Sequence, residues 1–190
     1  SITEHDWKCV DWAIEHDFLS LFALDSSILV EQHGHLDPFD LAWLEGELKR
    51  LNGKAAMIAF HHPPCDIKRF LDSDGDLFKL IAAHNVAGIL CGHIHTMKQY
   101  EVNGTWILSS GAVMTPRSGY CVFRVRQDEM TLFDRRPLED ETREVMTIPL
   151  NREARKMPAP GDVLLVSEVQ EKTIRVALPS GYEADKTILL

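Results

Sequence analysis

Four histidines lie in two short motifs, and each motif directly follows an apolar run. These histidines are His61, His62, His93 and His95. In the first motif, HHPP, the two prolines stiffen the loop and remove two amide donors. In the second motif, CGHIH, Gly92 lets the chain turn sharply, and an extended segment after it would point both histidines the same way. The two motifs therefore present imidazoles from fixed loops.

Imidazole is a common ligand of zinc, manganese and iron, and neutral nitrogen donors on fixed loops suit a catalytic metal site with open positions. The alternative is that each histidine is an ordinary structural residue. A buried histidine without a metal needs a hydrogen-bond partner and resists protonation, so a group of several is costly. We therefore predict that the two motifs bind metal together.

The segments around the motifs predict a parallel sheet covered by helices, which is an α/β fold. Strands are predicted at 7–12, 18–24, 55–60 and 87–92, and helices at 37–53 and 76–86. The strands at 18–24, 55–60 and 87–92 are short and largely apolar, whereas the helical segments have apolar residues at helical spacing, and Asp37 can cap the first of them. Neighbouring parallel strands end at the same edge of a sheet, and both histidine motifs follow predicted strands.

Hairpins and a charged tail are predicted after the second motif. Asn103-Gly104 and Gln127-Asp128 are turn pairs between strand-like runs, and we expect these strands at the later edge of the sheet. The proline-containing stretch 135–160 is typical of a connector, interrupted by a possible strand at 144–150. The tail can form one more hairpin. We therefore divide the chain into a domain over residues 1–135 and a connector with a β-hairpin extension over residues 136–190.

Composition argues against several classes of function. The 190 residues carry a formal charge of −9, which disfavours nucleic-acid and anionic-membrane partners. No apolar run approaches the ~20 residues that a membrane helix needs, and residues 1–12 lack the regions of a signal peptide. The scattered cysteines indicate free thiols in a reducing compartment, so the cytoplasm is predicted. They are Cys9, Cys65, Cys91 and Cys121.

The ordered pair of HHPP and CGHIH resembles the last two metal-binding motifs of the calcineurin-like metallophosphoesterase superfamily. The similarity is greatest to its bacterial cyclic-nucleotide phosphodiesterases and glycerophosphodiesterases. The surrounding segments FALDSS, LDPFDLAWLEGELKR and NGTWILSSGAV follow the same order, and the resemblance covers residues 7–135.

The resemblance implies the later half of a four-layer α/β/β/α sandwich that holds two divalent ions (Mn, Fe or Zn). It implies that His61 and His93 ligate one ion and that His95 ligates the other. His62, beside a ligand, is expected to lie in the outer shell or to order the loop, with contact to metal or substrate as the alternative, and it is the residue assigned a catalytic role. The implied reaction is attack of a metal-bound hydroxide on a small-molecule phosphoester, either a phosphodiester or a phosphomonoester.

Three earlier motifs of that superfamily are absent: an Asp-x-His, a Gly-Asp-x-x-Asp and a Gly-Asn-His. Without a bridging carboxylate two dications repel each other, and three neutral histidines cannot fill both coordination shells. A homodimer cannot restore the motifs, because every copy lacks them. The chain is therefore expected to be the later portion of a longer enzyme, to be completed by another chain, or to be a degenerate metal-binding or scaffold domain. By itself it is expected to be inactive.

An incomplete sheet also has a structural consequence. Strands such as 18–24 would lose neighbours and expose unpaired edges, which invites association with other copies. We therefore predict a homo-oligomer.

Other polar residues near the motifs are assigned to loops. HGHLD at 33–37 precedes a helix, and Asp25 ends a strand where a carboxylate can bond loop amides. Cys65 and Cys91 would complete a Cys2His2 zinc set, but the spacing lacks the short C-x-x-C that such sites use. Asp66 and Arg69 are assigned to the solvated surface in preference to a substrate contact, and an approach of Arg117 to phosphate is weighed but not favoured.

Overall fold

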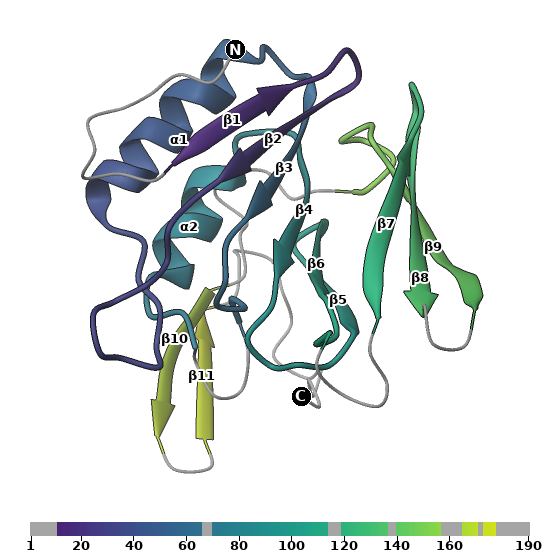
Figure 1. Ribbon diagram of the computed structural model, residues 1–190. Coiled ribbons are helices and arrows are strands. Elements are labelled where there is room, and N and C mark those ends of the chain that lie inside the picture. The colour runs from purple at the N-terminus through teal and green to yellow at the C-terminus, as the bar shows by residue number, and fades with distance from the viewer. Residues whose placement is uncertain are drawn as a thin grey trace.

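A six-stranded sheet, a three-stranded sheet and two helices form three layers in this computed structural model, and a separate two-stranded sheet lies in the tail (Figure 1). The structure describes residues 11–65, 70–113, 119–136 and 140–156 in full, and the backbone alone of residues 165–170 and 173–177. The helices cover one face of the larger sheet, and the smaller sheet packs on its other face. The predicted α/β fold class is confirmed.

The larger sheet contains six strands in the order β1-β2-β3-β4-β6-β5. They are β1 (Trp12–Glu15), β2 (Leu19–Ala23), β3 (Ala55–Ala59), β4 (Val86–Cys91), β5 (Lys98–Val102) and β6 (Thr105–Ser109). The four inner strands are parallel, and β1 and β5 are antiparallel edge strands. Parallel β3 and β4 end at the same edge, so the two histidine motifs emerge there side by side.

The first hairpin differs in part from the prediction. Within the described residues β1 begins at Trp12, whereas a strand was expected over 7–12, and residues 7–10 lie outside the described part. The prediction that strand 18–24 has an exposed edge is wrong, because β2 pairs with β1 on one side and with β3 on the other. The edge of the described sheet is β1 itself.

Helix α1 (Pro38–Arg50) begins as the sequence predicts. The Asp37 side chain accepts hydrogen bonds from the amides of Phe39 and Asp40, and the Asp40 carboxylate accepts one from the Asp37 amide. This reciprocal arrangement is a capping box, which satisfies amides that have no partner within the helix.

Helix α2 (Asp74–Ile81) is shorter than the predicted 76–86. It begins earlier and ends at Ile81, ahead of a turn that leads into β4. The Asn85 side chain holds this turn, because it donates hydrogen bonds to the carbonyl oxygens of Gly53 and Leu150. These bonds fix the position of Asn85 between the end of α2 and the start of β4, so the helix does not continue to residue 86.

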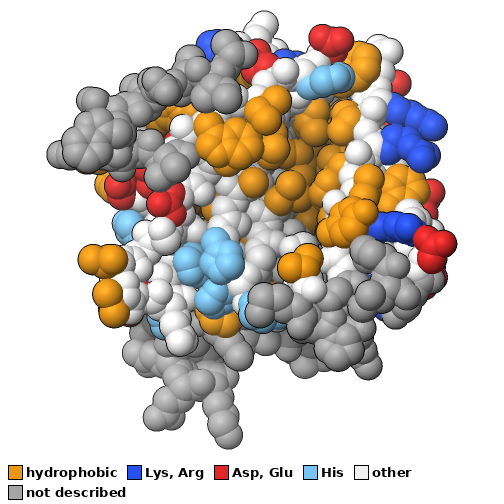
Figure 2. All heavy atoms as spheres, viewed as in Figure 1, with side chains coloured by type: hydrophobic (Ala, Val, Ile, Leu, Met, Phe, Trp, Pro, Cys, Tyr) orange, Lys and Arg blue, Asp and Glu red, His pale blue; other side chains and the backbone are white. Residues whose placement is uncertain are grey.

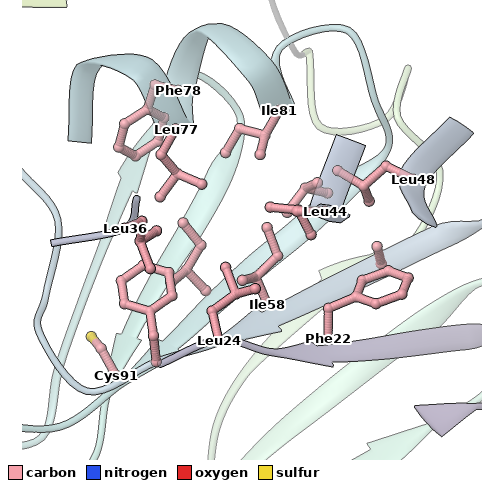
Figure 3. Packing of buried hydrophobic residues seen from close by; sticks show 14 of the residues in the cluster. Phe22, Leu24, Leu36, Leu44, Leu48, Ile58, Leu77, Phe78, Ile81 and Cys91 are labelled. Atoms are coloured by element: carbon pink, nitrogen blue, oxygen red, sulfur yellow. The ribbon is translucent and has the colours of Figure 1, made fainter. Parts of the chain in front are cut away.

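The main core lies between the helices and the larger sheet (Figure 3). Its fully buried members come from both layers: Phe22 and Ile58 from the strands, and Leu44, Leu77, Phe78 and Ile81 from the helices. Burial of large apolar side chains of this kind stabilises each by roughly 1.5–3 kcal/mol. This core fixes the strands whose ends carry the histidine motifs.

The smaller sheet is a correction to the prediction. It comprises β7 (Tyr120–Val125), β8 (Glu129–Arg136) and β9 (Glu141–Pro149), all antiparallel. Strands β7 and β8 were expected at the later edge of the larger sheet, but together with β9 they form a separate layer. The reason is the apolar second face of the larger sheet, where Met57 and Leu108 meet Met130, Leu132 and Ile148.

Strand β9 begins before the predicted 144–150 and pairs with the whole of β8. Part of the predicted connector therefore packs with the preceding residues, and the division at residue 135 stays a prediction. The tail contains an antiparallel pair, β10 (Leu165–Gln170) and β11 (Thr173–Ala177), as expected. None of the helices in the described residues is long and apolar enough to cross a membrane.

Candidate metal site

The loop after β3 is fixed from both sides. The Ser26 side chain is fully buried, and its hydroxyl oxygen lies 3.2 Å from the His61 amide nitrogen and 3.4 Å from that of His62. The Tyr100 hydroxyl donates a hydrogen bond of 2.6 Å to the carbonyl of Pro64. With the two prolines, these contacts hold the HHPP backbone in one conformation.

The loop after β4 is bonded directly to the first loop. The Gly92 amide donates to the His61 carbonyl at 3.0 Å, and the Ser109 hydroxyl donates to the Gly92 carbonyl. The expectation of an extended segment is wrong, because His93 and His95 have φ values of 62° and 55°. In this left-handed conformation the alternation that applies to a strand does not place the two side chains together.

Three of the four predicted histidines converge. His61, His62 and His93 each offer a ring nitrogen within 4.8 Å of the others. The nearest pair is His61 Nε2 and His93 Nδ1, which lie 3.2 Å apart. The ring centroids are 4.9–5.2 Å apart. Figure 2 shows histidine side chains gathered on the surface beside a broad area of hydrophobic side chains.

The His61–His93 pair fits one metal ion. Two imidazole nitrogens on a tetrahedral ion, each about 2.0–2.1 Å from it, are separated by roughly 3.3 Å. The observed 3.2 Å agrees with this value. His61 is exposed and His93 is half-buried, so an ion between them can reach solvent. Within the described residues the group contains no carboxylate, so the fit extends to one ion and not to a pair.

His95 stands apart from this group. Its side chain is exposed and does not share the three-histidine arrangement. Its predicted role as ligand of a second ion therefore stays a prediction. The His93 ring packs against the Phe70 ring, and the two ring centroids lie 4.4 Å apart.

His62 is the buried member of the group, with 5% of its surface exposed. Burial lowers the pKa of its imidazole, and the neighbouring His61 and His93 rings lower it further, against an opposing effect of the Ser26 backbone. The environment of the His62 ring therefore disfavours its charged form.

The weaker candidates take structural roles. The Asp25 carboxylate accepts a bond from the Ser27 amide, which is the loop role expected of it. The His35 side chain pairs with Asp72 at 2.6 Å and is not a member of the histidine group. The predicted surface residues Asp66, Arg69 and Arg117 lie outside the described residues.

Neither cysteine beside the motifs belongs to the histidine group. Cys91 is buried within β4. Burial and the nearby Asp74 carboxylate raise the pKa of the Cys65 thiol, which keeps it protonated. This agrees with the sequence argument against a Cys2His2 zinc set.

Ser26 and Gly34 are the residues that the sequence analysis missed. Ser26 contacts His62 through its hydroxyl, and Gly34 lies against the His62 ring. The sequence carries a faint signal for each: a small polar residue after a central strand, and a glycine inside the polar HGHLD loop. Neither signal identifies the histidine that it contacts.

No protein-family profile matches the chain. Curated relatives do match part of it. It is 28% identical over 108 residues to the 3',5'-cyclic adenosine monophosphate phosphodiesterase CpdA of Escherichia coli strain K12, covering 53% of this chain and 39% of CpdA. It is 28% identical over 126 residues to the probable glycerophosphodiester phosphodiesterase GpdQ of Arcobacter nitrofigilis. This match covers 57% of this chain and 46% of that relative.

A third relative is a 3',5'-cyclic-nucleotide phosphodiesterase of Nostoc, which is 35% identical over 79 residues, covering 38% of this chain and 30% of the relative. The chain thus spans less than half the length of these curated relatives.

Two solved structures share the fold. The purple acid phosphatase PPD1 of yellow lupin superposes with a TM-score of 0.57 at 13% identity, over 78% of this chain and 34% of that one. GAP50, described as the anchor in the inner membrane complex of Plasmodium, gives 0.55 at 14% identity, over 75% and 54%. At these identities the likeness concerns the fold alone.

Proposed function

We propose that the chain is the later portion of a calcineurin-like metallophosphoesterase and takes part in metal-dependent hydrolysis of a small-molecule phosphoester. Support comes from its similarity to bacterial phosphodiesterases over about half of its length and from the fold that it shares with a purple acid phosphatase. The curated relatives favour a phosphodiester, such as a cyclic nucleotide or a glycerophosphodiester, over a phosphomonoester. The observation that carries the proposal is the 3.2 Å approach of His61 and His93 from two loops at one sheet edge.

In the proposed site His61 and His93 hold one divalent ion, and His95 belongs to a second ion of a binuclear centre. Manganese, iron and zinc all accept imidazole ligands. A bound ion supplies an activated water and binds phosphate oxygens. His62 lies beside the ligand pair and takes the catalytic role that the sequence analysis assigns to it.

The acidic ligands of this centre come from polypeptide other than the residues that the structure describes. Support for this is the all-imidazole composition of the group. A neutral ligand set does little to offset the repulsion between two dications. For the isolated chain we accordingly expect weak metal binding and little or no hydrolysis.

A non-catalytic metal-binding or scaffold domain is the alternative. The described histidine group holds no carboxylate, which is compatible with this alternative, but the curated relatives are phosphodiesterases and do not favour it over the enzyme. The two functions differ in what completion of the site would produce: an enzyme gains turnover, whereas a scaffold domain binds metal and stays inactive.

Metal binding to the isolated chain is the first test. Calorimetric titration with zinc and with manganese is expected to show weak binding that His93→Ala abolishes. His16→Ala is the matched control, because His16 precedes the parallel strand β2 and so lies at the opposite edge of the sheet. Equal affinity of the wild type and His93→Ala would refute the proposed site.

Hydrolysis is tested in a chimera. The segment of CpdA that precedes its matched part is fused ahead of this chain, and turnover of bis(p-nitrophenyl) phosphate is measured with manganese. Turnover that His93→Ala removes supports the enzyme, and metal binding without turnover supports the scaffold. Robust turnover by the isolated chain would contradict the requirement for added carboxylates.

We also place the protein in the cytoplasm, as a homo-oligomer. Support for a reducing compartment comes from three free thiols among the described residues, those of Cys65, Cys91 and Cys121. Burial raises the pKa of the Cys121 thiol to about 11, so it is protonated and unreactive at neutral pH.

A further inference from the structure

A buried serine lies behind the histidine group. Ser26 has no exposed surface, and its hydroxyl oxygen lies 2.9 Å from Nδ1 of His62. The same oxygen accepts hydrogen bonds from the backbone amides of His61 and His62 at 3.2 and 3.4 Å. Three polar groups therefore converge on one hydroxyl that water does not reach.

The hydrogen-bonding capacity of this hydroxyl assigns its proton. A serine hydroxyl has one proton to donate and two lone pairs to accept with. The two amides can only donate, so they occupy both lone pairs. The proton of Ser26 is then directed to Nδ1 of His62, which must accept it. A neutral imidazole has one protonated nitrogen, so Nε2 of His62 carries the hydrogen.

The opposite tautomer leaves a buried proton without a partner. If Nδ1 of His62 carried the hydrogen, it would have to donate to Ser26, either to the hydroxyl or to the backbone carbonyl. The carbonyl oxygen already accepts from the His35 amide at 3.0 Å. In either case the Ser26 hydroxyl proton would have no acceptor among the described residues, which is costly for a fully buried group.

Gly34 prevents the ring from turning away. A Cβ atom on Gly34 would lie 2.2 Å from Nδ1 of His62 and 2.7 Å from the Ser26 carbonyl oxygen. The Gly34 backbone therefore packs directly on the imidazole. Its own position is fixed, because its amide donates to the carbonyl of Phe70 at 2.6 Å.

We propose that Ser26 is a positioning residue that holds His62 as the Nε2–H tautomer, so that His62 offers a hydrogen-bond donor and not a metal ligand. The only lone pair of the neutral ring faces Ser26 and is occupied. His61 and His93 instead turn one ring nitrogen each toward the other, at a distance of 3.2 Å. The three histidines thus divide into a ligand pair and a donor.

The donor suits an anionic oxygen of a phosphoester bound beside the metal. An N–H group favours a substrate oxygen that gains negative charge during hydrolysis. This part of the inference rests on the proposed function. The tautomer itself does not, because it follows from hydrogen bonds within the chain.

The tautomer is measured by long-range ¹H–¹⁵N NMR of the histidine rings, at about pH 8 where a free imidazole is neutral. The His62 ring is identified as the one missing from the spectrum of His62→Gln. We expect its Nε2 to resonate as a protonated nitrogen and its Nδ1 as an unprotonated one. A protonated Nδ1 in the wild type overturns the inference.

Two serine variants separate positioning from general packing. Ser26→Ala removes the donor to Nδ1, so the His62 signals should move toward those of mixed tautomers, and Ser26→Thr should restore them. Ser27→Ala is the matched control, because the Ser27 hydroxyl donates to Asp25 and does not contact the ring. An unchanged His62 tautomer in Ser26→Ala would overturn the role of the serine.

Zinc titration of the same sample distinguishes this inference from the proposed function. Coordination shifts at the rings of His61 and His93, with His62 still protonated at Nε2, support both. A coordination shift at His62 overturns the inference and leaves the metal site standing. No shift at any of the three rings overturns the metal site, while the tautomer is still read from the metal-free spectrum.

Discussion

At the scale of single residues, the conformation of the group depends on small side chains next to large ones. Gly34 leaves room for the His62 ring, and Ser26 is short enough to reach its Nδ1. Both positions are buried, so substitutions there act on packing before they act on chemistry. The arrangement of the histidine group therefore requires small residues at positions 26 and 34.

Gly34→Ala tests this constraint. The added methyl group would overlap His62 and a backbone oxygen, and overpacking of this kind costs about 1–3 kcal/mol. We expect a lower free energy of unfolding by urea denaturation and a displaced His62 ring signal by NMR.

Gly46→Ala provides the matched control. Gly46 lies within α1 and a Cβ there meets nothing within 4 Å, so alanine should raise stability by roughly 0.5–1 kcal/mol. Equal effects of the two substitutions would contradict the packing described for Gly34.

At the scale of elements, the site depends on two strands and on the helix that covers them. Helix α1 packs Leu44 and Leu48 in the same core as Ile58 of β3, the strand that leads into the HHPP loop. The short helix α2 adds Leu77 and Phe78 to that core. The edge of the sheet that carries the histidine group therefore depends for its stability on the packing of the helices against the sheet.

Asp37→Ala tests the start of α1. It removes both side-chain hydrogen bonds of the N-cap, and such losses typically cost about 1 kcal/mol. Thermal unfolding should show a lower midpoint, and Asp37→Asn should recover most of it because the amide oxygen can still cap.

Asp76→Ala serves as the reference for loss of an exposed acidic side chain. Asp76 contacts Lys79 on the surface of α2, and pairs of this kind contribute roughly 0.2–0.5 kcal/mol. A loss in Asp37→Ala no larger than in this reference would argue against the capping box.

At the scale of the whole molecule, the larger sheet is covered on one face and only partly covered on the other. Ala13 of β1 faces the helical core, so its neighbours Trp12 and Ile14 face the opposite side, where they are 36% and 53% exposed. Figure 2 shows the hydrophobic side chains gathered on this face, next to the histidines. An apolar face at an edge strand favours association.

Ile14→Lys tests whether this edge mediates the proposed oligomer. Light scattering should give a dimer or larger assembly for the wild type and a smaller one for the variant, because a lysine on an edge strand opposes pairing with another copy. Leu29→Lys is the control, since Leu29 is 91% exposed in a loop outside the sheet. A wild-type monomer would refute the prediction.

The sequence alone was enough to predict the parallel strands, the first helix and the edge at which the histidine motifs meet. These features follow from local information: apolar runs of strand length, the cap at Asp37 and the turn pair Asn103-Gly104, both of whose residues have positive φ. The helix satisfies its own backbone hydrogen bonds, whereas each strand is marked by its apolar residues and pairs with a neighbouring strand. The convergence of His61 with His93 follows from them.

Only the tertiary structure decided which histidines lie together. His95 leaves the group because a left-handed turn replaces the expected extended segment, and His62 joins it because Ser26 and Gly34 hold its ring from behind. These contacts join residues far apart in the chain. No periodicity or spacing encodes them, since they arise from close packing of three loops at one edge of the sheet.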